Sequence, residues 1–505
     1  MIQSTRLGLL QFVPPPMNTT FWEAFQQLTL IGQVLFFTAL LVAFAFEFIN
    51  GFHDTANAVT TVIYTKTLRP TPAVLFSGLM NFLGVLLGGT AVAFSIVNLL
   101  PVDLLIEGSS ARAIVMVLSL LLAGVIWNLG TWWMGLPVSS SHTLIGSILG
   151  VGLANSLLTR GDLSGVNWAK AMDVGTALLV SPLAGFLAAA LLLQIMKLLF
   201  RNPNLYHPPG EGENPPSWIR GVLLATCGGV SFAHGSNDGQ KGMGLVLLTL
   251  IGFLPTYYSL DLRHPELAHQ LRASAESIDQ RLSETGLATL EIHEQLHQIQ
   301  ILLADRHDLS AVPSDHRWQV RQSIFRFRMS LTAARLPGDL LAELNPEMRV
   351  LQHSIEYVPL WVVVGTALAL GIGTTIGYQR IVVTIAEKIG KTHLTYAQGA
   401  AAETVAALTI MIADRFHLPV STTHVLSSGV AGTMWSNNSG VQPQTVRRIL
   451  LAWIFTLPAA MSIAAALFLS FGWMLGNGTT HLQPVAQVHS ADSASPGPMS
   501  FSGNR

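Results

Sequence analysis

Two aspartates lie within long apolar segments of this chain, each inside a short polar motif. Asp54 belongs to Gly51-Phe-His-Asp-Thr-Ala-Asn57, and Asp238 belongs to Gly235-Ser-Asn-Asp-Gly-Gln-Lys241. A carboxylate in a segment that spans a membrane costs on the order of 3 kcal/mol even on lenient insertion scales. Such a group persists where it faces a cavity, binds a cation or carries a proton. The pair therefore predicts a site that binds a cation or a proton.

A second pair of motifs is rich in hydroxyl groups. Leu136-Pro-Val-Ser-Ser-Ser-His-Thr143 and Leu418-Pro-Val-Ser-Thr-Thr-His-Val425 precede short apolar stretches over 143–158 and 424–435. A helix needs about 20 residues to span a bilayer, so we expect discontinuous or re-entrant helices in these two places. The start of such a helix offers free backbone N–H groups and a positive dipole end. Together with the hydroxyls, these groups predict a site for an oxyanion.

The two pairs of motifs form a repeat. Pro137 follows Asp54 by 83 residues, and Pro419 follows Asp238 by 181 residues. The difference of 98 residues is close to the length of one charged segment at 259–354. Without this segment, the two halves have the same motifs in the same order and at the same spacing. Repeats of this kind characterise secondary transporters, which bind substrates on broken helices at the repeat interface.

The composition predicts an all-α integral membrane protein. Half of the 505 residues are hydrophobic, 11% are charged, and the mean hydropathy is +0.48, whereas soluble domains usually have about 25% charged residues. The net charge of −1 gives no reason to expect a nucleic acid partner. A single cysteine, Cys227, excludes a disulfide framework. Long apolar stretches occur near 29–49, 73–100, 113–134, 172–200, 219–233, 243–258, 357–377, 396–413 and 448–475.

One segment carries a large share of the charge, because residues 259–354 hold 23 of the 55 Asp, Glu, Lys and Arg residues. Its His293 and His297 are one helical turn apart and could hold a metal, but a solvated helical insert explains the composition better.

Basic residues in short loops favour the cytoplasm, so Lys66 and Arg69 predict a cytoplasmic loop and an external N-terminus. The predicted division is a tail over 1–28, a first membrane repeat over 29–200, a polar linker over 201–218, the start of a second repeat over 219–258, a soluble helical insert over 259–354, the rest of the second repeat over 355–475, and a disordered tail over 476–505.

The four motifs together resemble a known family. Phe48–Ala58 with Phe232–Gly242, and Leu136–Gly146 with Leu418–Ser428, are similar to the paired signatures of the Pit family of inorganic phosphate transporters. The resemblance runs from about residue 40 to 475 and is strongest to the low-affinity enterobacterial members. It implies an inverted-repeat fold of ten to twelve membrane helices with two re-entrant hairpins, in the bacterial inner membrane.

The resemblance also implies a transport mechanism. Phosphate would be imported by symport with protons, as a neutral complex with a divalent metal that travels as cargo; no cofactor or resident metal is implied. Sodium-coupled relatives usually have Asn-Asp where this chain has His53-Asp54. A histidine with a pKa near ~6.5 could titrate in the useful range. Sodium coupling and a sulfate permease of the same fold remain the alternatives, and a homodimer is left open.

Site residues follow from the motifs. The hydroxyls and Asn side chains are assigned to phosphate, and the aspartates with the first histidine to the coupling cation or proton. An enzyme such as a membrane phosphatase is not expected, because no Arg lies in the motif regions to clamp a phosphate ester. The expected substrate-binding residues are Asn57, Ser139, Ser140, Ser141, Asn237, Ser421, Thr422 and Thr423; the expected coupling residues are Asp54, Asp238 and His53; further candidates are His142, His424, Lys241, Glu47 and Glu403.

Overall fold

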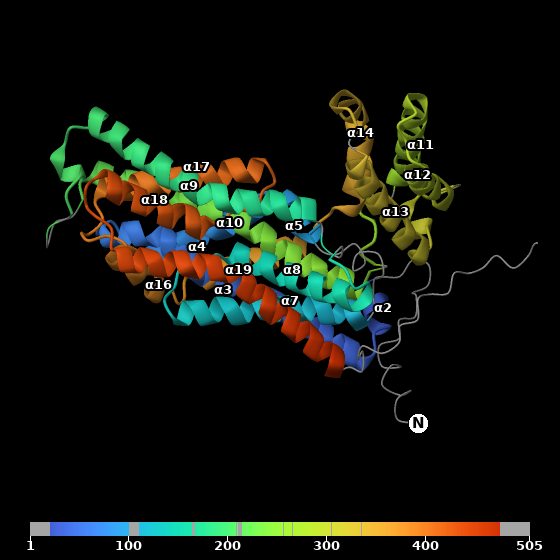
Figure 1. The fold of residues 1–505 in the computed structure, drawn as a ribbon, viewed down its shortest axis with the longest axis horizontal. Helices are drawn as coiled ribbons and strands as arrows, with labels where there is room; N and C mark the ends of the chain where they lie inside the picture. Colours follow the sequence, from blue (N-terminus) through green and yellow to red (C-terminus); the bar gives the residue numbers. More distant parts are fainter. Residues whose placement is uncertain are drawn as a thin grey trace, which may run out of the picture.

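The computed structural model consists of helices and their connections throughout its described part (Figure 1). It describes residues 21–99, 111–163, 166, 168–208, 210, 215–255, 257–264, 266–304, 306–334 and 336–474, without the side chains at 23, 55–57, 111, 169–170, 173–174, 315 and 386–387. Of the predicted tail over 1–28, residues 1–20 lie outside the described part of the chain. The whole of the predicted tail over 476–505 also lies outside it. The expected all-helical fold class is confirmed.

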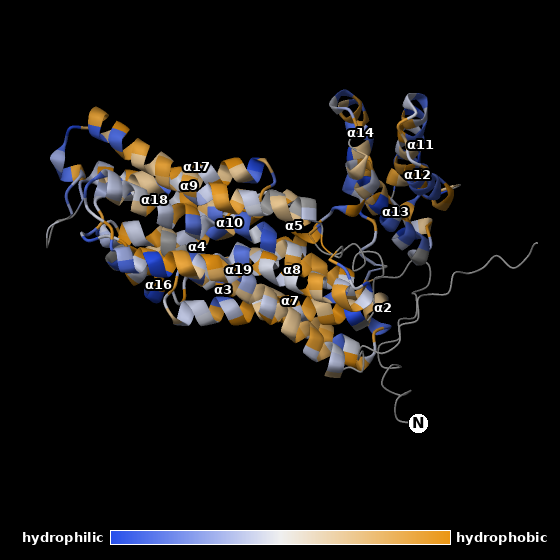
Figure 2. Cartoon of the chain, in the orientation of Figure 1, coloured by the Kyte–Doolittle hydropathy of each residue, from blue (hydrophilic) through white to orange (hydrophobic). Residues whose placement is uncertain are grey.

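The membrane body contains ten helices of 15 residues or more among the described residues. Six helices are long and apolar enough to cross a membrane by length and composition. Figure 2 shows apolar residues along the outer helices of this bundle. The ten are α3 (Leu30–Tyr64), α4 (Pro70–Leu87), α7 (Ala111–Trp133), α8 (Ser140–Thr159) and α9 (Trp168–Leu199), followed by α10 (Ser217–Phe253), α15 (Leu360–Thr374), α17 (Tyr396–Arg415), α18 (Thr422–Ser436) and α19 (Pro443–Met474).

Shorter helices complete the described body. α2 (Phe21–Gln26) precedes the first long helix, and α5 (Ala91–Val97) follows α4. α16 (Gln379–Val383) continues into a π-helical turn at Thr384–Lys388. The 3₁₀ turn at Pro203–Leu205 lies in the connection between α9 and α10.

The two halves of the body run in opposite directions. α3 ends at Tyr64, and just beyond it the Lys66 Nζ donates to the carbonyl of Gly210, which precedes α10, at 2.9 Å. The end of α3 and the start of α10 therefore lie at the same end of the bundle (Figure 1). Both α9 and α19 contain an internal proline, Pro182 and Pro458. The order of the five long helices in each half thus repeats with inverted direction.

The halves interlock through their last helices. α9 of the first half packs on α18 of the second, and α19 of the second half packs on α8 of the first. A Cβ at Gly150 in α8 would lie 2.2 Å from the carbonyl oxygen of Met461, and one at Gly432 in α18 would lie 2.3 Å from that of Phe186. These two matching contacts need glycine, because a side chain would force the helices apart.

We expect Gly150→Ala to destabilise the folded transporter by roughly 1–3 kcal/mol, the usual cost of overpacking a tight contact. Gly175→Ala in α9 is the matched control, because nothing lies within 4 Å of a Cβ there and alanine favours a helix over glycine by about 1 kcal/mol. The two variants are compared by their unfolding temperatures, which are measured on purified protein by size-exclusion chromatography after heating. Equal unfolding temperatures for both would show that α8 and α19 tolerate the added methyl group.

Residues 259–354, predicted as the insert, largely coincide with a four-helix unit that has its own hydrophobic core. The unit lies at the end of the bundle near α2 (Figure 1). Arg321 joins its two connections to the body, because its Nη1 donates to the carbonyl oxygens of Tyr258, Ser259 and Ile355 at 3.4, 3.3 and 2.8 Å. The helices are α11 (Leu267–Thr285), α12 (Leu290–Leu302), α13 (Ser314–Ala333) and α14 (Gly338–Ile355), with a 3₁₀ turn at Leu309–Ala311.

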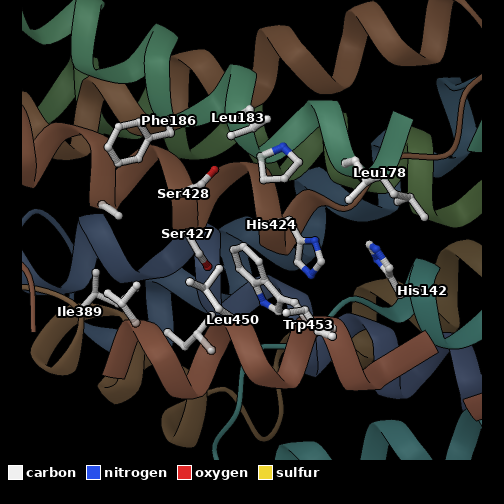
Figure 3. Close-up of a pocket in the computed structure, with 16 residues that line it drawn as sticks. His142, Leu178, Leu183, Phe186, Ile389, His424, Ser427, Ser428, Leu450 and Trp453 are labelled. Carbon is white, nitrogen blue, oxygen red and sulfur yellow. The ribbon is translucent and has the colours of Figure 1, made fainter. Parts of the chain in front are cut away.

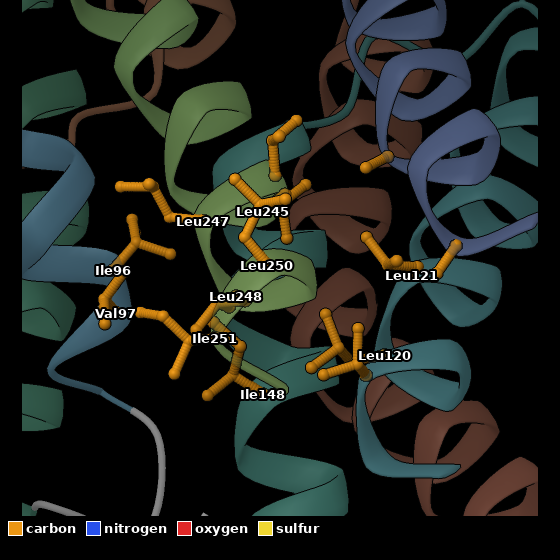
Figure 4. Close-up of a cluster of buried hydrophobic side chains, with 14 of the residues drawn as sticks. Ile96, Val97, Leu120, Leu121, Ile148, Leu245, Leu247, Leu248, Leu250 and Ile251 are labelled. Carbon is orange, nitrogen blue, oxygen red and sulfur yellow. The ribbon is translucent and has the colours of Figure 1, made fainter. Parts of the chain in front are cut away.

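Two apolar clusters fill the body, and the polar residues lie between them. One cluster contains the second part of α10, including Leu245, Leu248 and Ile251, packed near Ile96 and Leu120 (Figure 4). The other contains the first part of α10 and the last part of α3. The middle of α3 and of α10 therefore forms a buried polar layer between two apolar ones, and this layer contains both aspartates.

Candidate functional site

Both predicted hairpin motifs begin a helix in the same way. The Ser139 hydroxyl accepts from the His142 N–H at 3.2 Å at the start of α8, and the Ser421 hydroxyl accepts from the His424 N–H at 3.1 Å at the start of α18. Both serines are N-caps, which are satisfied by such bonds. They therefore position the helix starts through an acceptor lone pair, and each hydroxyl keeps its O–H donor for a further contact.

The hydroxyls that follow these caps are the candidates for anion contacts. Ser140 and Thr422 occupy equivalent positions in the two repeats, and both are buried. Neither side-chain oxygen has a hydrogen-bond partner among the described residues. A buried polar atom without a partner is costly, and each of these lies beside the free N–H groups of a helix start. The arrangement provides matched donors from both halves for an oxyanion.

Asp54 of the first half is held by the second hairpin. The Thr423 hydroxyl donates to Asp54 Oδ1 at 2.5 Å, and His53 Nδ1 lies 3.2 Å from the same oxygen. His53 Nε2 in turn lies 3.5 Å from the Thr131 hydroxyl on α7. Asp54 and His53 are both buried. The aspartate therefore links α3 directly to α18, across the boundary between the repeats.

Asp238 of the second half has three polar side chains beside its carboxylate. Lys241 Nζ donates to Asp238 Oδ1 at 2.6 Å, Asn50 Nδ2 donates to Oδ2 at 3.3 Å, and His234 Nε2 lies 3.5 Å from Oδ2. Asn50 also lies 3.4 Å from Glu47 Oε1. Glu47, one of the further candidates from the sequence, thus has Asn50 as a direct contact and belongs to the Asp238 network.

Lys241 and Asn237 tie α10 to both hairpin tips. Lys241 Nζ donates to the Ser141 hydroxyl at 2.6 Å and to the Val420 carbonyl at 2.8 Å. Asn237 donates to the Leu418 carbonyl at 3.3 Å and accepts from the Val420 N–H at 3.4 Å. The side chain of Asn57, the remaining expected phosphate ligand, lies outside the described residues.

The two aspartates meet in the centre of the body. Asp54, His234 and Asp238 each offer one ligand atom, and these atoms all lie within 4.8 Å of one another. A cavity of about 10 Å³ borders Asp54, His234 and Thr422, which is close to the smallest space that can hold one water. Two carboxylates and one imidazole suit a cation. His234 was not among the predicted site residues. It precedes Asp238 by four residues, and nothing in that motif indicates that its side chain also lies close to Asp54.

Another buried carboxylate, Glu403, lies on α17. Glu403 accepts from the Thr61 hydroxyl on α3 and from the Thr226 hydroxyl on α10, the latter at 2.5 Å. Asp414, near the end of the same helix, accepts from the Ser236 hydroxyl at 2.5 Å and from Gln240 Nε2 at 2.8 Å. The sequence analysis named Glu403 and missed Asp414. These bonds fasten α17 to the helices that carry the aspartates.

A separate cavity of about 710 Å³ lies between α9, α18 and α19. Figure 3 shows His142, His424 and Trp453 on its wall, facing leucines and Phe186. The His142 and His424 ring centroids lie 4.6 Å apart, and the His424 and Trp453 centroids lie 3.9 Å apart. Because nearly all of the lining is apolar, this cavity is poorly suited to an oxyanion. The His424 ring thus stacks on Trp453 and lies tilted against His142, on the wall of this apolar cavity.

This inverted pair of helical halves, with carboxylate and imidazole side chains enclosed at their interface, is the architecture of a secondary transporter. A family model described as the phosphate transporter family matches residues 50–464. The chain belongs to this family. It is therefore a phosphate transporter rather than an enzyme, and a multi-pass protein of the bacterial inner membrane.

Individual relatives agree with this assignment. The low-affinity inorganic phosphate transporter PitA of Escherichia coli K12 is 40% identical over 491 residues, which cover 88% of this chain and 98% of the relative. PitB of the same strain is 40% identical over 483 residues, covering 86% and 96%. A solved structure, "The sodium-dependent phosphate transporter", aligns with a TM-score of 0.52 and 19% identity over 88% of this chain and 99% of the other. This last likeness supports the fold.

Removing both matched hydroxyls tests the anion contacts. We expect the double variant Ser140→Ala, Thr422→Ala to raise the KM for phosphate roughly 10- to 100-fold, because each lost hydrogen bond contributes about 0.5–1.5 kcal/mol net and a factor of ten corresponds to about 1.4 kcal/mol. Ser147→Ala in α8 is the control, since its hydroxyl already donates to the Thr143 carbonyl at 2.8 Å. The measurement is the concentration dependence of phosphate uptake. An unchanged KM would remove these two hydroxyls from the substrate site.

Proposed function

We propose that the chain imports inorganic phosphate by symport with protons, either as the free ion or as a neutral complex with a divalent metal. The observation that carries the proposal is the meeting of Asp54, Asp238 and His234 beside the two hairpin tips. An anion site next to carboxylates needs a positive charge to offset repulsion. A proton or cation that binds at the carboxylates supplies it, so phosphate and the coupling ion favour each other's binding.

Protons are favoured over sodium by the partners of the aspartates. Each aspartate has a histidine of its own repeat as neighbour, His53 for Asp54 and His234 for Asp238. Imidazole is the side chain whose ordinary pKa lies nearest neutrality. The adjoining cavity of about 10 Å³ also leaves little room for a hydrated ion. A sodium-coupled carrier, or a permease for sulfate, is the alternative.

Uptake into proteoliposomes tests the proposal. Labelled phosphate is added while a proton gradient, a sodium gradient and external Mg²⁺ are imposed one at a time, with sulfate as competitor. We expect uptake to follow the inward proton gradient, to be insensitive to sodium and to resist competition by sulfate. Uptake that followed sodium and ignored pH would overturn proton coupling, and strong competition by sulfate would overturn selectivity for phosphate. Stimulation by Mg²⁺ would support the neutral metal complex, and its absence would favour the free ion.

A further inference from the structure

Lys241 breaks the symmetry of the repeat at the ion-binding centre. It follows Asp238 by three residues, and the residue that follows Asp54 by three is Asn57. Asparagine is uncharged, whereas a lysine ammonium carries a full positive charge. Lys241 is 1% exposed, so its charge is not placed in water. The second half of the protein therefore carries a fixed positive charge where the first half has an amide.

The ammonium of Lys241 has the surroundings of a bound cation. It donates to a carboxylate oxygen of Asp238 at 2.6 Å, to the hydroxyl of Ser141 at 2.6 Å and to the carbonyl of Val420 at 2.8 Å. These match the three N–H donors of an ammonium. Carboxylate, hydroxyl and backbone carbonyl oxygens are also the ligands that hard cations prefer. The ligands come from α10 and from both hairpin tips.

The position at Asp54 has the same ligand types as the position at Asp238, and the hydroxyl again comes from the other half. By the spacing of the motifs, Asp54 corresponds to Asp238, Thr423 to Ser141 and the Val138 carbonyl to that of Val420. The Thr423 hydroxyl donates to Asp54 at 2.5 Å, so an aspartate of one half meets a hairpin hydroxyl of the other. This repeats the arrangement in which Asp238 and Ser141 share the Lys241 ammonium.

We propose that the Lys241 ammonium is a tethered cation that permanently occupies the second of two equivalent cation positions. Only the position at Asp54 then exchanges its ion during transport. This proposal rests on the proposed symport. A covalently attached charge stays with the protein when phosphate is released. The number of coupling ions that move with each phosphate is therefore one lower than it would be with two exchangeable positions.

The test is Lys241→Asn, which copies the residue of the first half. Thermal unfolding of the purified variant is measured in chloride salts of ammonium, potassium, sodium and choline at equal ionic strength. We expect a saturable rise in unfolding temperature with ammonium, potassium or sodium but not with choline, because an ion that binds the folded state stabilises it. The native protein and Lys241→Arg, which keep the charge, are expected to show a smaller rise or none, because only the position at Asp54 is open to an ion in them. A folded Lys241→Asn protein that no ion stabilises would overturn the proposal.

A second readout separates this proposal from the proposed function. The reversal potential of phosphate flux in proteoliposomes gives the charge moved per phosphate, which is expected to rise by one in Lys241→Asn. If the native protein shows no gradient-driven uptake, the proposed symport fails, while ion binding to the variant still decides the role of Lys241. If the charge per phosphate is unchanged in an active variant, the tethered cation is overturned.

If Lys241→Asn fails to fold, the double variant Lys241→Asn, Asp238→Asn serves as its control. If Lys241→Asn unfolds in choline but folds with a small cation present, the ion replaces the ammonium and the proposal is supported. If the single variant unfolds in every salt while the double variant Lys241→Asn, Asp238→Asn folds, then Lys241 only neutralises Asp238 and no cation position exists there. That outcome would overturn the proposal.

Discussion

Replacing Asp54 by asparagine is expected to lower gradient-driven phosphate uptake roughly 100-fold, which corresponds to about 2.7 kcal/mol. The amide keeps the size of the side chain and can still accept from Thr423, which donates to Asp54 at 2.5 Å in the native protein. It cannot carry a negative charge, so it neither binds a cation nor takes up a proton at neutral pH. The measurement compares uptake of labelled phosphate under an imposed gradient with phosphate exchange at equal concentrations on both sides.

The control for this variant is Asp162→Asn. Asp162 lies outside the site and accepts from the Ser156 hydroxyl at 2.7 Å just after α8. This variant is expected to take up phosphate like the native protein. Full gradient-driven uptake by Asp54→Asn would remove Asp54 from the coupling role and leave Asp238 and His234 to perform it.

Replacing Asp238 by asparagine is expected to destabilise the fold by about 3–5 kcal/mol, the usual effect of removing one partner of a buried ion pair. The Lys241 ammonium lies 2.6 Å from Asp238 and is buried, so it would lose its bonded anionic partner. Adding Lys241→Met removes the second charge and should restore most of the unfolding temperature, without restoring transport. Thermal unfolding in detergent, followed by size-exclusion chromatography, measures both variants.

The double variant is the decisive comparison. If Asp238→Asn alone is as stable as the native protein, the ion pair contributes little to folding. If the double variant is no more stable than the single one, the loss comes from other contacts of Asp238, such as those with Asn50 at 3.3 Å and His234 at 3.5 Å.

The sequence was sufficient to predict the fold class and the family. Apolar stretches of membrane length and the repeated motifs around Asp54 and Asp238 predicted a helical membrane protein with two repeats. The resemblance to the Pit family implied that the repeats are inverted, and the confirmed family agrees. Both serines after the Pro-Val pairs were correctly expected at helix starts. The motifs predict these features because capping and span length are local properties of a sequence.

The partners of the site residues could not be predicted from either motif alone. Thr423 bonds to the aspartate of the other half, and Lys241 bonds to Ser141 of the other half. His234 joins the aspartates, and Asp414 joins Ser236 and Gln240, in contacts between helices. A one-dimensional repeat specifies which residues are equivalent. It does not specify that the halves exchange partners, because that depends on how long helices cross in three dimensions.

The crossed packing of the last helices has a consequence for biogenesis. α8 is covered by α19, whose residues Pro443–Met474 are the last helix in the described chain. During synthesis from the N-terminus, the first hairpin is therefore inserted into the bilayer long before its partner exists. Gly150, which fits against Met461 in the finished protein, faces lipid or the insertion machinery until then. Packing of α8 in its final place must accordingly follow translation of α19, and a nascent chain that ends before α19 leaves α8 without its cover.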